Sequence, residues 1–146
     1  MPTIAPITSA DEREWRALWE GYLRFYASEV PAEVTEMTFA RLVADGVLHG
    51  AMARDDDGRA VGIVHWLFHP ATWRRGEYCY LEDLFVAPDL RRGGVGSALI
   101  GHVRDQARSA GAEKVYWLTQ SENSTARRLY DAVATSTGFV HYEMEI

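Results

Sequence analysis

Residues able to do chemistry are concentrated in one stretch of the sequence, Tyr78 to Ile100. Two adjacent carboxylates, Glu82 and Asp83, interrupt an apolar and aromatic run, and a glycine-rich turn with the sequence RRGGVGS follows at 91–97. Glycines let backbone N–H groups approach a ligand closely, and the first turn of a helix has unpaired N–H groups that bind anions. The stretch therefore predicts a site for a phosphate-bearing ligand.

The two carboxylates restrict how the strand that carries them can be built. An unpaired carboxylate is costly to bury, so Glu82 needs either a wet cleft or a partner such as an arginine, and we favour the cleft. Successive residues of a regular strand point to opposite faces. Glu82 and Asp83 can therefore serve one site only if the strand contains a bulge.

The glycine turn does not fit two familiar nucleotide motifs. A P-loop needs lysine and then serine or threonine after its last glycine, but Ser97 and Ala98 follow Gly96. A dinucleotide fingerprint that starts at Gly94 needs glycine or alanine where Leu99 stands. By itself the turn leaves open a phosphate site or merely a tight connection between a strand and a helix.

Composition sets the broad class of protein. The 146 residues are 47% hydrophobic and 25% charged, as expected for a single globular domain at 1–146. A net charge of −6 argues against nucleic acid as a partner. Cys79, the only cysteine, fits a packed core thiol in a reducing compartment. Without a leader-like or membrane-length apolar segment, we expect a soluble cytoplasmic protein with no membrane partner.

Hydrophobic periodicity and turn residues predict the elements that must position these groups. We expect strands at 3–8, 47–54, 59–69, from 78, at 114–119 and at 139–146. We expect helices from Ser9 to about Tyr26, from 32 to 45 with a stop at Gly46, from about Val95 to a stop at Gly111, and from a cap at Asn123 to a point before Gly138. The order β-α-α-β-β-β-α-β-α-β predicts an α/β or α+β sheet with helices on both faces. His65 and His69 fall on a strand, where they are too far apart to share a metal, so no metal site is expected.

The motif after the central strand resembles that of a known enzyme family. Arg91-x-x-Gly94-x-Gly96 follows a strand that ends in FVAP, and it is similar to the Arg/Gln-x-x-Gly-x-Gly/Ala motif of the GCN5-related N-acetyltransferases (GNAT). Asn123, Tyr130 seven residues later, and Gly138-Phe139 extend the likeness. The YLEDLFV segment looks most like the diamine (spermidine/spermine-type) and Hpa2-like branches, and the segment 131–137 suggests the longer fourth helix of the Hpa2-like branch.

The resemblance implies a single N-acetyltransferase domain whose fourth and fifth strands splay apart. It implies acetyl-CoA as the donor, with the pyrophosphate on the backbone of 92–97, the pantetheine arm along 84–86, and a side-chain contact from Asn123. The cofactor-binding candidates are Leu84, Phe85, Val86, Arg91, Arg92, Gly93, Gly94, Val95, Gly96, Ser97, Asn123 and Tyr130.

The resemblance also implies catalytic roles. Tyr130 matches the general acid, since a free phenol with a pKa of about 10 keeps its proton at neutral pH. Glu82 matches the carboxylate that receives a proton from the amine. A bulge near these carboxylates is a habit of the family, and it would bring Asp83 to the same site.

The expected acceptor is a small primary amine, polyamine-like or amino-acid-derived. Its candidate binding residues are Tyr26, Glu29, Trp66, Tyr80 and Asp83. Tyr22, near the end of the first predicted helix, could also surround the ammonium group. A homodimer is expected on family grounds. Two alternatives stay open: an acetyltransferase acting on protein lysines or N-termini, and a non-catalytic acetyl-CoA-binding module.

Overall fold

The computed structural model of the chain describes residues 1–91 and 93–146, so Arg92 lies outside the described residues. The chain divides into two compact units, Met1–Tyr116 and Trp117–Ile146. Each unit is described by itself below.

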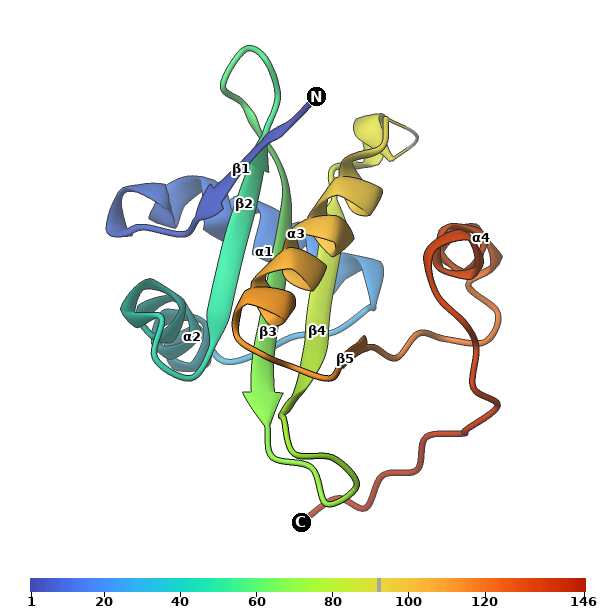
Figure 1. The fold of residues 1–146 in the computed structure, drawn as a ribbon. Coiled ribbons are helices and arrows are strands. Elements are labelled where there is room, and N and C mark those ends of the chain that lie inside the picture. Colours follow the sequence, from blue (N-terminus) through green and yellow to red (C-terminus); the bar gives the residue numbers. More distant parts are fainter. Residues whose placement is uncertain (92) are drawn as a thin grey trace. The chain divides into compact units, whose positions relative to one another are not determined.

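The first unit is built on a five-stranded sheet in the order β1-β2-β3-β4-β5 (Figure 1). The first four strands pair antiparallel, and β5 pairs parallel to β4, so the sheet is mixed. The strands are β1 (Thr3–Pro6), β2 (His49–Arg54), β3 (Ala60–His69), β4 (Tyr78–Val86) and β5 (Lys114–Tyr116). The predicted hairpin between the second and third strands is confirmed, with Gly58 at φ 81° in its turn.

Helices cover both faces of this sheet, as predicted. Figure 1 shows α3 in front of β3 and β4, and α1 behind them. The helices of the first unit are α1 (Glu12–Phe25), α2 (Ala32–Ala44) and α3 (Val95–Ser109), with short 3-10 turns at Ser9–Asp11 and Pro88–Leu90. Pro31 precedes α2 as its N-cap, because proline fits the start of a helix but not its interior.

Each face of the sheet buries its own apolar layer. On one face, Trp15, Leu18 and Trp19 of α1 pack in a cluster with Ile63 and Phe85 of the sheet. On the other face, the predicted stripe of α3 is buried at Val95, Leu99, Val103 and Ala107. A Cβ at Gly62 would lie 3.0 Å from Leu99 Cδ1, so the missing side chain lets α3 lie close to β3.

The fourth and fifth strands separate after three residue pairs. β5 pairs with β4 only at Tyr78–Lys114, Cys79–Val115 and Tyr80–Tyr116, whereas β4 continues to Val86. Within the described chain, that edge of β4 beyond Tyr80 pairs with no strand. The predicted splay is therefore present, and it leaves backbone groups of 81–86 available to a ligand.

The second helix ends one residue earlier than predicted. Asp45, not Gly46, is the C-cap of α2 and takes the left-handed conformation with φ 54°. Aspartate tolerates this region because its short side chain can hydrogen-bond locally. Here the Asp45 carboxylate lies 2.6 Å from Nδ1 of His49.

The second unit contains α4 (Ser124–Val133), which is capped as predicted by Asn123. Three other expectations for this part of the chain are wrong. The strand expected at 114–119 stops at Tyr116, and the helix ends at Val133 without extending to 137. The residues 139–146 form no strand, and Phe139, Tyr142 and Met144 are exposed. Alternating apolar residues can form a strand only beside a partner, and the described residues of this unit contain no strand to supply one.

No helix among the described residues is long and apolar enough to span a membrane.

Candidate functional site

A bulge in β4 brings the two carboxylates together. His65 of β3 pairs with Asp83 and the next residue, Trp66, pairs with Leu81, so Glu82 is an extra residue in β4. A bulge of this kind interrupts the alternation of faces. The charges of both Glu82 and Asp83 act on the hydroxyl of Tyr22, and both act on that of Tyr80. The bulge that the sequence required for a shared site is therefore present.

A buried chain of hydrogen bonds, from Trp15 through His65, ends at the Asp83 carboxylate. Nδ1 of His65 lies 2.9 Å from the Asp83 carboxylate, and the indole Nε1 of Trp15 donates to Nε2 of His65 over 3.0 Å. The His65 side chain is 3% exposed and that of Asp83 is 15% exposed. Residues from α1, β3 and β4 thus meet at one carboxylate.

Two tyrosines at the end of α1 complete the surroundings of Asp83. Burial, then the charge of Asp83 and a hydrogen bond donated to it, raise the pKa of Tyr22 far above its ordinary value. Burial and the Asp83 charge also raise the pKa of Tyr26. The two rings are 5.1 Å apart, edge to face. They form an aromatic wall whose hydroxyl groups stay protonated beside a carboxylate.

Glu82 has different surroundings from Asp83. The residue is exposed, yet partial burial of its carboxyl and the neighbouring Asp83 charge raise its pKa above the ordinary value. Tyr80 lies nearby and stacks on Tyr116 at 5.0 Å. A carboxyl with a raised pKa that remains accessible is suited to accept a proton.

Of the other residues expected to bind the acceptor, Trp66 lies on the opposite face of the sheet from Asp83. Trp66 is 6% exposed and points to the α3 face, where its ring lies 5.8 Å from that of His102. Glu29 is exposed in the connection between α1 and α2. Tyr26, Tyr80 and Asp83 do lie at the carboxylate pair.

Two residues of this site, Trp15 and His65, were not predicted. Trp15 and His65 are 50 positions apart in the sequence, so only the fold brings them together. The available signal was a histidine inside the apolar run 61–68, since a buried polar group needs a partner.

The glycine turn has the conformation that an anion site needs. Gly94 has φ 80° and is the N-cap of α3, where no side chain caps the helix and no acidic residue occupies its first turn. The backbone N–H groups at the start of α3 therefore have no competing carboxylate among the described residues.

Arg91 connects this turn with other parts of the first unit through side-chain contacts. Its Nε donates to the Val86 carbonyl over 3.3 Å, and its guanidinium carbon lies 5.0 Å from the Phe25 ring centre and 5.5 Å from that of Phe85. The side chain thus links the turn, the end of α1 and the end of β4.

Two expected site residues belong to the second unit. Asn123 caps α4 by accepting from the Ala126 N–H over 3.3 Å. The Tyr130 ring lies on α4, 5.5 Å from the ring of Trp117, edge to face.

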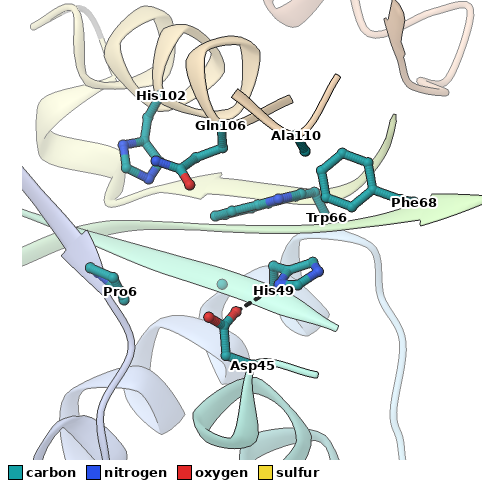
Figure 2. Close-up of a pocket in the computed structure, with 9 residues that line it drawn as sticks. Pro6, Asp45, His49, Trp66, Phe68, His102, Gln106 and Ala110 are labelled. Carbon is teal, nitrogen blue, oxygen red and sulfur yellow. Dashed lines mark hydrogen bonds and ion pairs between the residues drawn. The ribbon is translucent and has the colours of Figure 1, made fainter. Parts of the chain in front are cut away.

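A separate hollow lies on the α3 face of the first unit (Figure 2). It has a volume of about 230 Å³ and is lined by Pro6, Asp45, His49, Gly50, Trp66, Phe68, His102, Gln106 and Ala110. Figure 2 shows the rings of Trp66 and Phe68 near His49, whose ring is held by Asp45. Because Trp66 and His65 are neighbours on opposite faces of β3, the sheet separates this hollow from the carboxylates.

Cys79 is a core residue, as predicted. It is fully buried, and burial raises the pKa of its thiol to about 11. The thiolate needed for nucleophilic chemistry is therefore rare at neutral pH.

Comparison with known proteins shows which family the sequence matches. The model of the acetyltransferase (GNAT) family matches residues 14–134. A D-amino-acid N-acetyltransferase of Saccharomyces cerevisiae is 39% identical over 142 residues, which cover 96% of this chain and 88% of that protein. An aminoglycoside N(6')-acetyltransferase type 1 of Klebsiella aerogenes is 31% identical over 86% of this chain and 83% of its own length.

A solved structure shows the same fold. AAC(6')-Iy, in complex with the bisubstrate analogue CoA-S-monomethyl-acetylneamine, has a TM-score of 0.86 at 19% identity and covers 100% of this chain and 99% of its own. At this level of identity the likeness concerns the fold.

Proposed function

The chain belongs to the GNAT family of acetyltransferases, and we propose that it transfers an acetyl group from acetyl-CoA to the primary amine of a small cationic molecule. The observation that carries the proposal is the bulge in β4, which places Glu82 and Asp83 beside the tyrosines of one site. Residues 1–146 would act as one catalytic domain, in keeping with a structural likeness that spans 100% of the chain. The homodimer stays a prediction.

The donor side of the proposal rests on the glycine turn and the splayed strands. The uncapped start of α3 after Gly94 fits a pyrophosphate, with backbone contacts at 93–97. The edge of β4 at 84–86 fits the amide-bearing pantetheine arm, because no strand among the described residues pairs with it on that side. A solved structure of the same fold holds a coenzyme A analogue, which supports acetyl-CoA as the donor.

The acceptor side rests on charge and aromatic rings. A protonated amine is attracted by Glu82 and Asp83 and by the faces of aromatic rings such as those of Tyr26 and Tyr80. The relatives named for D-amino acids and aminoglycosides act on compounds that carry amino groups. We therefore expect polyamine-like or amino-acid-derived amines as acceptors.

In the proposed mechanism, Glu82 takes a proton from the bound ammonium, directly or through water. The freed amine attacks the thioester carbonyl carbon, a new C–N bond forms and the C–S bond breaks. The Tyr130 hydroxyl donates a proton to the departing sulfur, and the proton that the nitrogen loses as the amide forms restores the Tyr130 hydroxyl. Acetyl-CoA supplies the activated acetyl group.

An acceptor screen tests the proposal. Purified protein and acetyl-CoA are incubated with polyamines, D- and L-amino acids, aminoglycosides and a lysine-containing peptide, and both free thiol and acetylated product are measured. We expect acetylation of at least one small amine. Acetylation of the peptide alone would overturn the small-amine acceptor in favour of a protein acceptor. Binding of acetyl-CoA without turnover of any compound would favour a non-catalytic module.

A further inference from the structure

We propose that His65 is a positioning residue for Asp83. Asp83, oriented in this way, binds the ammonium group of the acceptor, while Glu82 accepts a proton from that group. This inference rests on the proposed function and assigns separate tasks to the two carboxylates. It also gives a role to a buried histidine that the transfer chemistry itself does not use.

The geometry places His65 between a fixed donor and the carboxylate. Trp15 is fully buried in the α1 layer, stacked on Trp19 at 5.6 Å, so its indole cannot move freely. Its Nε1 reaches Nε2 of His65, and the opposite ring nitrogen reaches Asp83. Both ring nitrogens of His65 are therefore engaged, and the ring is locked in orientation.

The chemistry of the donor determines where the proton of His65 lies. An indole N–H can only donate, so Nε2 of His65 must accept and carries no hydrogen. The single proton of the neutral ring is then on Nδ1, where it is donated to Asp83. Trp15 thus selects the one tautomer that makes His65 a donor to the carboxylate.

Asp83 is consequently fixed from two sides. It accepts from His65 of β3 and from the hydroxyl of Tyr22 on α1. A carboxylate oriented by donors from two different elements presents its remaining lone pairs in a fixed direction. Its side chain keeps 15% exposure, which leaves an accessible edge for a cation.

Glu82 lacks this support. It is the extra residue of the bulge, it is exposed, and none of the hydrogen bonds or ion pairs found among the described residues fixes its carboxylate. The two carboxylates therefore differ in mobility: a fixed one suits binding, and a mobile one suits proton transfer.

Two matched variants separate this role from simple packing. In His65→Asn, the amide nitrogen lies where Nδ1 was and can still donate to Asp83, but the acceptor for Trp15 is lost. In His65→Gln, the longer amide reaches the position of Nε2 and can accept from Trp15, but the donor to Asp83 is lost. Each variant therefore preserves one half of the chain.

We expect His65→Gln to raise KM for the amine by about tenfold or more, with kcat and KM for acetyl-CoA changed far less. His65→Asn should stay within about threefold of the wild type in amine KM, because the bond to Asp83 survives. The reverse order, with Asn impaired and Gln normal, would show that His65 serves only Trp15 and would overturn the inference. Equal amine KM for both variants and the wild type would overturn it too.

A measurement on the wild-type protein covers the case in which the variants do not fold. Nitrogen-15 NMR of histidine-labelled protein reports which ring nitrogen of His65 is protonated. We expect the Nδ1–H tautomer, and a change in that resonance when a turned-over amine saturates the site in the presence of coenzyme A. An Nε2–H tautomer, or no change, would overturn the inference. If the wild type acetylates no amine, the proposed function fails instead, which is a distinct result.

Discussion

The two carboxylates at the bulge in β4 are neighbours with different surroundings. Asp83 is half-buried and accepts hydrogen bonds from His65 and Tyr22, whereas Glu82 is exposed and has a raised pKa. Proton transfer at neutral pH is most efficient when the pKa of the base is raised toward the working pH. Partial burial disfavours the charged form of the Glu82 carboxylate. For the same reason the carboxylate binds a proton more strongly than an ordinary glutamate does.

A Glu82→Gln variant should lose most turnover but no stability. The folded-state pKa of Glu82 is raised, so the folded protein binds this proton more tightly than the unfolded chain does. The stability from this group is present at low pH and is lost as pH rises through the folded pKa, so at neutral pH the ionised carboxylate disfavours folding. We expect kcat to fall by about 100-fold, with a melting temperature at pH 7 equal to or above that of the wild type. A melting temperature clearly below the wild type would contradict this account.

The pH profile of the wild type provides a second check on Glu82. A general base must be deprotonated, so kcat/KM should fall as pH decreases through its pKa. Because burial and Asp83 raise this pKa, the fall should begin at a higher pH than for an ordinary glutamate. Asp83→Asn removes the neighbouring charge and should move the acidic limb to lower pH. An unchanged limb would mean that another group titrates there.

Tyr130→Phe tests the other catalytic assignment. The substitution removes one hydroxyl from α4 and keeps the ring that packs edge to face with Trp117. We expect acetyl-CoA to bind within about twofold of the wild type by calorimetry, and thiol release to fall by about 100-fold. Undiminished thiol release would remove Tyr130 from the role of general acid.

At the scale of elements, the features predicted correctly are those that depend on residues close together in the sequence. The helix stop at Gly111, the turn at Gly58 and the buried stripe of α3 follow from conformational freedom and periodicity, and all are present. The contact of Trp15 with His65 was not predictable, because it depends on how α1 lies on β3. The strand expected at 139–146 was wrong because a strand needs a partner as well as an alternating pattern.

The glycine turn can be tested with a matched pair of substitutions. Gly94 and Gly58 have nearly the same left-handed φ, 80° and 81°, and at both positions a Cβ would meet none of the described residues within 4 Å. Gly94→Ala and Gly58→Ala should therefore each lower the free energy of unfolding by about 1 kcal/mol.

Only Gly94→Ala should weaken acetyl-CoA binding, by about tenfold or more, because only Gly94 precedes the helix start that we propose binds the pyrophosphate. Titration calorimetry with coenzyme A measures this difference, and chemical denaturation verifies that the stability losses match. Equal coenzyme A affinities for the two variants would place the phosphate elsewhere.

At the scale of the whole molecule, the net charge of −6 gives the acceptor hypothesis a measurable consequence. An acidic protein attracts cationic substrates over long distances, and salt screens this attraction. The Debye length shortens from about 30 Å at 0.01 M to about 3 Å at 1 M ionic strength. The rate of encounter with a polyamine should therefore depend strongly on salt.

Two acceptors of different charge separate this effect from general effects of salt on the enzyme. We expect kcat/KM for a multiply charged polyamine to fall by about tenfold between 0.01 M and 1 M salt. For a zwitterionic amino acid, whose net charge is zero, the fall should be much smaller, since the long-range attraction is missing. The two profiles are measured by thiol release at fixed saturating acetyl-CoA, so that donor binding contributes equally to both. Parallel profiles would mean that the acidic balance of the chain does not guide the acceptor, and that recognition depends only on the short-range contacts of Glu82, Asp83 and the tyrosines beside them.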